Sequence, residues 1–165
     1  MNKKFLEKKF IINFLVVFSI FLFDRLSKIY IIYLDKKFLG AKIYYSKFLD
    51  IDLVWNEGIA FGLLSFDEKY FYNILTIIIF VIILIIFFMS VKSDSFKKYS
   101  LLMIMGGALG NLIDRIFYQA VPDFIDIHYE NFHWFIFNIA DVFITIGVIS
   151  MIIIEIFDTN KNYKL

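Results

Sequence analysis

A few aspartates in this 165-residue chain have the residue type and surroundings needed for chemistry. Asp141 stands alone in an apolar segment, residues 135–154, with no Lys or Arg within one helical turn to neutralise it. Two aspartates that lie close together in a low-dielectric place share a proton, so one can activate water as a base while the other acts as an acid. The partner of Asp141 can be Asp123 or Asp114, and residue types alone do not choose between them.

Other kinds of catalysis lack their residues. The chain has no cysteine, which removes thiolate nucleophiles and disulfides. It has no HExxH motif, and His128 and His133 are five residues apart, without a regular ligand spacing, so we expect no metal site. Ser27 and Lys28 are adjacent on a helix and point about 100° apart, which prevents a Ser–Lys pair. No cofactor-binding motif is visible, and carboxylate chemistry remains.

The elements that position these aspartates are expected to cross a membrane. The chain is 61% hydrophobic with 22 Phe, whereas a soluble domain is about 45–50% apolar. A hydrocarbon core of about 30 Å takes roughly 20 helical residues to cross. Four segments meet that length: residues 10–33, 71–91, 99–117 and 135–154. We therefore predict an all-α integral membrane protein that forms one domain over residues 1–165.

The distribution of lysines predicts the orientation of these spans. Lysines gather at the N-terminus, in the loop between the second and third spans, and in the C-terminal tail, whereas residues 118–134 contain no Lys or Arg. The loop after the first span has five lysines, but six acidic residues accompany them. The positive-inside rule then places both termini in the cytoplasm. The net charge of +1 gives no sign of nucleic-acid binding.

With this orientation, the unusual polar residues fall on one level, in the outer leaflet. Charged groups within spans are costly and mark function or pairing. Nothing comparable occurs in the inner halves of the spans, so we expect one site near the outer surface. Its candidate residues are Asp24, Lys28, Asn56, Asn111, Asp114, Arg115, Asp123, Asn138 and Asp141.

Each of these residues also has a purely structural interpretation. Asp24 and Lys28 are four residues apart, the spacing of a helical ion pair. Asp114 and Arg115 are helical neighbours that do not face each other, so each needs a partner elsewhere. Arg115 is either an interfacial anchor or a clamp for a lipid phosphate or peptide carbonyl. The asparagines can join helices by hydrogen bonds, and the glycines of residues 106–110 can permit close helix packing.

Two non-enzymatic functions compete with catalysis by aspartates. A proton-relaying transporter subunit would need polar groups at several depths, and the inner halves of the spans have none. A membrane scaffold would leave Asp123 and Asn56 without a purpose. The loop after the first span is the only segment in which we recognise strand character, with loosely alternating aromatic and β-branched residues over 42–62. We expect it to form a small β element on the outer face of the membrane.

Five segments, in order along the chain, resemble the motifs of the type II (lipoprotein) signal peptidase family. Any one of them is a modest signal, but chance does not readily produce five of them in the same order. They are DRLSK (Asp24–Lys28), NEGIAFG (Asn56–Gly62), GGALGNLIDR (Gly106–Arg115), VPDFID (Val121–Asp126) and FNIAD (Phe137–Asp141).

The resemblance implies a fold, a reaction and a set of roles. The fold would be four transmembrane helices with a small periplasmic β-cradle in the bacterial inner membrane. The reaction would be removal of the signal peptide from a prolipoprotein, before a lipobox cysteine that carries diacylglycerol. No metal or cofactor is implied, and we expect a monomer surrounded by membrane lipids. Asp123 and Asp141 would be catalytic, and the supporting or substrate-binding residues would be Asn56, Gly58, Asn111, Asp114, Arg115, Asn138, Asp24 and Lys28.

Two positions depart from the family pattern near the aspartates. Members commonly have a β-branched residue before the first catalytic aspartate, where this chain has Pro122. Its ring fixes φ and removes a donor N–H. Many members also have a proline before the FN pair, where this chain has Phe135 and Ile136. Both changes concern the geometry around the aspartates and leave the aspartates themselves in place.

Overall fold

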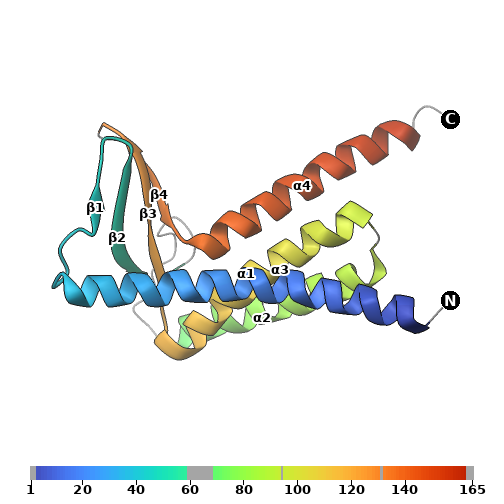
Figure 1. Cartoon of the computed structure of the whole chain (residues 1–165), viewed down its shortest axis with the longest axis horizontal. Coiled ribbons are helices and arrows are strands. Elements are labelled where there is room, and N and C mark those ends of the chain that lie inside the picture. The colour runs from blue at the N-terminus through green and yellow to red at the C-terminus, as the bar shows by residue number, and fades with distance from the viewer. Residues whose placement is uncertain (1–2, 59–68, 94, 131, 163–165) are drawn as a thin grey trace.

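The computed structural model describes residues 3–58, 69–93, 95–130 and 132–162, and within them it has four long helices and a four-stranded sheet (Figure 1). Each helix contains a segment long and apolar enough to cross a membrane. The prediction of four spans is therefore confirmed. The helices are α1 (Lys3–Lys37), α2 (Lys69–Lys92), α3 (Ser95–Tyr118) and α4 (Ile139–Asn162).

Helix α3 is the centre of the bundle and contacts each of the other three helices. Half of its most apolar window is buried, against 11% of the corresponding window in each other helix. Large apolar side chains on the other helices, such as Ile77 and Phe88 of α2, are exposed on the outer surface of the bundle. This distribution is what a bundle surrounded by lipid requires, because the lipid tails are as apolar as a protein core.

Glycines allow α3 to approach its neighbours closely, as the sequence predicts. A Cβ atom on Gly107 would collide with the carbonyl oxygen of Ala140 in α4. A Cβ atom on Gly110 would collide with the carboxylate of Asp24 in α1. The absence of side chains at these two positions therefore sets the distances at which α1 and α4 carry their polar residues toward α3.

The sheet has the order β1-β2-β3-β4 and is antiparallel throughout. Its strands are β1 (Tyr44–Tyr45), β2 (Leu49–Asn56), β3 (Val121–Tyr129) and β4 (Phe132–Phe137). The expectation that only the loop after the first span has strand character was wrong, because β3 and β4 follow the third span. Their aromatic and β-branched residues favour strands, but they run directly into the apolar helix that follows, which hides the boundary.

The start of the fourth helix also differs from the prediction. Residues 135–137 belong to β4, and α4 begins at Ile139. Asn138 caps the helix: its side-chain oxygen accepts the backbone N–H of Asp141 (3.1 Å), and the Asp141 carboxylate accepts the backbone N–H of Asn138 (3.1 Å). This reciprocal capping box satisfies two otherwise unpaired amides. It ends the strand and starts the helix at one residue.

Pairing between β2 and β3 places Asn56 beside Asp123. Val54 pairs with Asp123 and Asn56 pairs with Val121, after a register shift between Ile51 and Val54 that adds one residue to β2. Bulges of this kind re-aim side chains and are frequent near active sites. Pro122 pairs with Trp55 on the β2 side, where β4 does not yet flank β3. A proline is tolerated there because no second ladder needs its N–H.

The sheet stands at one end of the helix bundle, and both chain termini lie at the other end (Figure 1). This arrangement follows from the chain order: the connections α1–α2 and α3–α4 contain the strands and lie at one end, whereas the short α2–α3 connection lies at the other. The first turn of α4 and the last turns of α3 therefore meet the sheet at the same end of the molecule. The residues of the predicted site lie at this junction.

The close approach of α3 and α4 gives a test of the packing. We expect Gly107→Ala to lower the free energy of unfolding by about 1–3 kcal/mol, because the added methyl group meets backbone that cannot rotate away. Thermal unfolding of the detergent-solubilised protein measures the change. The control is Ile85→Ala, which shortens an exposed side chain of α2 and should have little effect. Equal melting temperatures for wild type and Gly107→Ala would contradict the close packing.

Candidate active site

Asp123 and Asp141 meet at the junction of the sheet and the fourth helix, and Asn138 lies between them. Asp123 is the third residue of β3, and Asp141 is in the first turn of α4. The Asn138 side-chain amide donates to Asp123 Oδ1 at 2.6 Å, while its backbone N–H donates to Asp141 Oδ2 at 3.1 Å. One fully buried residue thus binds both carboxylates.

Each carboxylate has a second amide partner from another element. Asn56 of β2 donates to Asp123 Oδ2 at 2.9 Å, and Asn111 of α3 donates to Asp141 Oδ1 at 2.8 Å. Neutral amide donors orient a carboxylate without neutralising its charge as an arginine or lysine would. The two aspartates are therefore held in place by neutral donors, without a cation bound to either carboxylate among the described residues.

A small cavity lies against the two aspartates. Its volume is about 40 Å³, which is enough for roughly one to three water molecules. The lining includes both carboxylate residues, two asparagines and the guanidinium of Arg115. The full lining is Asn56, Asn111, Arg115, Val121, Asp123, Phe135, Ile136 and Asp141. The two residues that replace the proline of the family pattern, Phe135 and Ile136, thus form part of its wall.

The surroundings of Asp123 favour its protonated form. Its exposed fraction is only 4%. This burial, together with repulsion by the Asp141 carboxylate, raises the pKa of Asp123 from 3.8 to about 6, although the amides of Asn56 and Asn138 oppose the shift. Burial disfavours an ionised carboxylate, and a second carboxylate nearby disfavours it further. Asp123 therefore keeps a proton up to about pH 6, well above the range of an exposed aspartate.

Asp114, the other possible partner of Asp141, lies instead in a buried ionic cluster. Lys28 donates to Asp114 Oδ2 at 2.7 Å and to Asp24 at 3.0 Å. Arg25 binds both oxygens of Asp114, with Nη2 donating to Oδ2 at 2.6 Å. Two anions and two cations balance, as burial in a low-dielectric bundle requires. The predicted Asp24–Lys28 pair is present, and it is part of this larger cluster.

Sequence reasoning missed Arg25. The residue was visible as a charge in the first span, and its neighbour Asp24 had been singled out, but nothing in the sequence paired it with Asp114, 89 positions away. The available signal was charge balance, because Asp24 and Asp114 with Lys28 alone would leave one buried negative charge. A second cation in the same turn was therefore needed.

The ionic cluster connects to the two aspartates through Asn111. Its side-chain oxygen accepts from Lys28 Nζ at 2.7 Å and from Asn138 at 3.2 Å, while its amide donates to Asp141. Asp24 also accepts the backbone N–H of Ala140 at the start of α4, at 3.0 Å. The ionic cluster therefore anchors both the first turn of α4 and the amides that orient the carboxylates.

Arg115 is buried, with an exposed fraction of 7%, and so does not act as an anchor at the membrane surface. Its Nη2 donates to the carbonyl oxygen of Gly58 at 2.7 Å, which ties the end of β2 to α3. Its Nε and Nη1 have no hydrogen-bond partner among the described residues. The motif residues that follow, 59–62, lie outside the described part of the chain. The guanidinium also lies over the ring of Tyr72, 5.5 Å from its centroid, and within the described residues it keeps unpaired donors at the wall of the small cavity.

A much larger apolar groove reaches Asp141 from the other side. Its volume is about 570 Å³, within the range of ligand-binding pockets. Aromatic side chains of the β3–β4 hairpin, among them Phe132, Trp134 and Phe137, form one wall, and Val142, Thr145 and Ile146 of α4 form the other. Asp141 lies in the lining of both the groove and the small cavity. An apolar ligand in the groove would reach the carboxylates.

Asp114 offers a test that separates structure from chemistry. We expect Asp114→Asn to cost about 3–5 kcal/mol of stability, because it leaves Arg25 and Lys28 with one carboxylate for two buried cations. Thermal unfolding and the yield of folded protein measure this loss. The control, Asp158→Asn, removes an exposed carboxylate of α4 and should have no such effect. Full stability with complete loss of activity would instead assign Asp114 to the reacting group.

Comparisons with known proteins agree on one family. The family model described as "Signal peptidase (SPase) II" matches residues 16–157. The chain is 50% identical over 154 residues to the lipoprotein signal peptidase of Pelagibacter ubique, covering 93% of each protein. It is 36% identical over 150 residues to that of Anaplasma phagocytophilum, covering 90% of this chain and 94% of the relative.

Solved structures show the same fold. One, described as a bacterial membrane enzyme, matches with a TM-score of 0.72 and 34% identity, over 90% of each chain. Another bacterial membrane enzyme matches with a TM-score of 0.63 and 34% identity, over 86% of this chain and 90% of the other. Together with the family match, these similarities show that the chain belongs to the lipoprotein signal peptidases, the signal peptidase II family of membrane aspartic peptidases that remove signal peptides from prolipoproteins.

Proposed function

We propose that Asp123 and Asp141 are the catalytic pair of this signal peptidase. The observation that carries the proposal is their convergence on Asn138, from a strand and a helix, around a cavity with room for water. Neither carboxylate has an ion-pair partner within hydrogen-bond distance among the described residues, whereas Asp24 and Asp114 are neutralised by cations. Only the former pair can therefore exchange protons without breaking a buried ion pair.

The reaction follows from the shared proton. The ionised carboxylate removes a proton from water, and the oxygen of that water attacks the scissile carbonyl carbon. The protonated carboxylate donates to the carbonyl oxygen, giving a neutral tetrahedral intermediate. When the C–N bond breaks, the proton taken from water passes to the leaving amine. The unpaired N–H groups of Arg115 can donate to a substrate carbonyl and hold it against the pair.

The remaining site residues support this pair. The carboxylates are oriented by the side-chain amides of Asn56, Asn111 and Asn138. The carbonyl oxygen of Gly58 accepts a hydrogen bond from Arg115. Asp24, Lys28 and Asp114 hold the helices that carry them, through the ionic cluster described above. No step in this scheme requires a metal or a cofactor.

The apolar groove supports a lipid-modified substrate. We infer that the substrate is a prolipoprotein whose lipobox cysteine carries diacylglycerol, and that cleavage occurs just before this cysteine. Aromatic residues of the hairpin and apolar residues of α4 line the groove, and Asp141 is part of the same lining. It offers an apolar segment of the substrate a path from the surrounding membrane lipids to the catalytic pair.

The orientation in the membrane follows from the same geometry. Both termini lie at the end of the bundle opposite the sheet (Figure 1). The lysines of the N-terminus, the α2–α3 connection and the C-terminal tail are at that end, which supports a cytoplasmic location for it. The sheet and the catalytic pair would then face the periplasmic side of the inner membrane. The site is formed within one chain, which supports a monomer as the active unit.

Conservative variants of the two aspartates test the assignment. We expect Asp123→Asn and Asp141→Asn each to lower kcat for cleavage of a diacylglyceryl-modified prolipoprotein at least about a hundredfold, because each removes a proton donor or acceptor. Asp123→Asn removes a carboxylate whose ionisation burial opposes, but it turns one acceptor oxygen into a donor that faces Asn56 or Asn138; the variant is expected to fold, and its melting temperature at pH 7 verifies this. The control is Asp52→Asn, in β2 but outside the cavity. Substantial turnover by either variant would refute the assignment.

The pH dependence of the wild type is a second test. With the pKa of Asp123 near 6, the proton shared by the pair is lost as the pH rises above that value. We therefore expect kcat/KM to fall above about pH 6, and the apparent pKa of this fall belongs to the pair as a unit. Initial rates from pH 4.5 to 9 in one detergent measure it. A kcat/KM that keeps rising between pH 6 and 8 would contradict the shared proton.

A further inference from the structure

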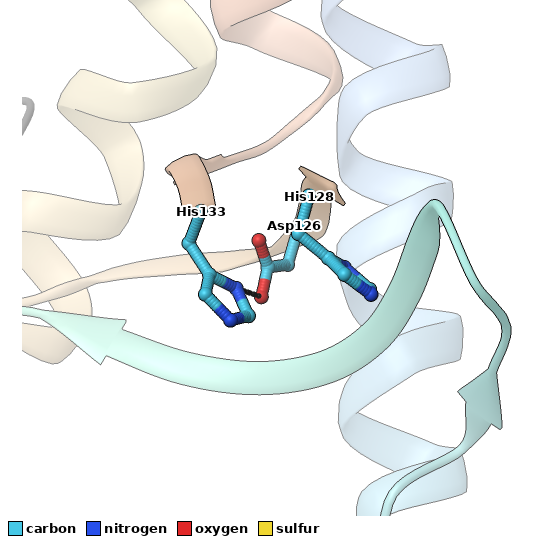
Figure 2. Close-up of side chains that lie close together, drawn as sticks. All are labelled: Asp126, His128 and His133. Atoms are coloured by element: carbon cyan, nitrogen blue, oxygen red, sulfur yellow. Dashed lines mark hydrogen bonds and ion pairs between the residues drawn. The ribbon is translucent and has the colours of Figure 1, made fainter. Parts of the chain in front are cut away.

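Three side chains with metal-ligating groups lie together on the hairpin of β3 and β4 (Figure 2). Asp126 and His128 come from β3 and His133 from β4, and one ligating atom of each lies within 4.8 Å of the others. His128 pairs directly with His133 across the two strands. None of the three lines the small cavity at the catalytic pair. They therefore form a group separate from the proposed reaction.

Sequence spacing predicted no metal here, because five residues separate the histidines. In a hairpin this separation has the opposite meaning, since a short turn folds the chain back and sets the two residues opposite each other. The two rings stack with their centroids 4.9 Å apart. Asp126, two residues before His128, has its Oδ2 2.8 Å from His133 Nδ1. The fold thus builds a ligand set that linear spacing does not show.

Two buried ligand atoms of this group are unpaired. His128 is only 8% exposed, and its Nδ1 has no hydrogen-bond partner among the described residues. The Oδ1 of Asp126 is buried and unpaired in the same sense. Leaving a buried polar atom without a partner costs about 1–3 kcal/mol. A lone pair on a buried imidazole nitrogen and another on a carboxylate oxygen are what a cation would use.

The second ring nitrogen of His128, Nε2, has a carboxylate neighbour of the kind that metal-binding histidines have. His128 Nε2 lies 3.9 Å from Asp50 Oδ1, and Lys42 binds the other oxygen of Asp50 at 2.8 Å. This hydrogen bond from Lys42 holds the Asp50 carboxylate in place beside the ring. Histidines that bind metals commonly have a carboxylate or carbonyl beside their second nitrogen, which orients the ring and increases its basicity.

We propose that Asp126, His128 and His133 bind a divalent transition-metal ion of the Zn²⁺ class. Two imidazoles and one carboxylate are a ligand set that Zn²⁺ accepts, with water in the fourth position. Ions such as Mg²⁺ prefer all-oxygen ligands and are disfavoured. Ligand atoms around tetrahedral Zn²⁺ are about 3.3 Å apart. His133 is half exposed and can turn inward to close the gap from 4.8 Å.

The bound ion would fasten the hairpin of β3 and β4. Residues of this hairpin, including His128 itself, form a wall of the apolar groove that reaches Asp141. A crosslink between β3 and β4 would hold the shape of that wall, which faces α4 across the groove. The role is structural, and the ion takes no part in the proposed cleavage.

Metal binding by the full-length, tag-free protein in detergent tests the proposal. After removal of metals with a chelator, titration with Zn²⁺ and with Co²⁺ should give one site per chain, and Co²⁺ should show visible absorption bands of a four-coordinate ion. Saturating Zn²⁺ should raise the melting temperature. His133→Gln and Asp126→Asn should each weaken Zn²⁺ binding at least about tenfold and abolish the rise in melting temperature. Loss of a residue that only hydrogen-bonds to a metal ligand already lowers metal affinity about tenfold, and loss of a ligand should lower it at least as much.

Glu130→Gln is the matched control, because it removes an exposed carboxylate from the same hairpin. It should bind Zn²⁺ as the wild type does. His133 is exposed, so His133→Gln is expected to fold, and its melting temperature without metal verifies this. Absence of stoichiometric binding by the wild type would overturn the proposal. Equal affinity in the wild type, His133→Gln and Asp126→Asn would overturn it as well. Peptidase activity enters neither readout, so this test is independent of the catalytic assignment.

Discussion

The site depends on the contacts that the buried ammonium group of Lys28 makes. This group is almost fully buried and donates to Asp24, Asn111 and Asp114. A buried charge is tolerated only when paired and hydrogen-bonded, and here the pairing draws α1 and α3 together. Through Asp24 the same cluster accepts a backbone N–H of α4, and through Asn111 it reaches Asp141. The same contacts therefore neutralise the buried charges and position Asp123 and Asp141, the proposed catalytic pair.

Asn138 joins the sheet to the helix bundle. As the cap of α4 it ends β4, starts the helix, and places Asp141 in the first turn. Its side-chain amide reaches Asp123 in the neighbouring strand. One residue therefore supplies both the cap of α4 and the bridge between the two carboxylates, which the proposed sharing of a proton requires to lie close together.

The sheet brings polar and apolar surfaces to the same point. The β2–β3 pairing places Asn56 against Asp123 beside a cavity of about 40 Å³. The aromatic residues of β4 also line an apolar groove, and Asp141 belongs to the lining of both. The proposed cleavage beside a lipid-modified cysteine needs water and hydrocarbon close to each other. The edge of a sheet that lies across the end of a membrane bundle provides both.

The sequence by itself determined the four spans, because continuous apolar runs of about 20 residues have few alternatives. It also determined that the chemistry belongs to aspartates, since cysteine is absent and no metal-binding or serine motif is present. The choice of Asp123 over Asp114 came from resemblance to a family. Only the tertiary structure showed the partner of Asp114, the strands β3 and β4, the start of α4 at Ile139, and the pairing of His128 with His133. These features depend on contacts between residues far apart in sequence or on strand register, and the periodicity of a single segment contains neither.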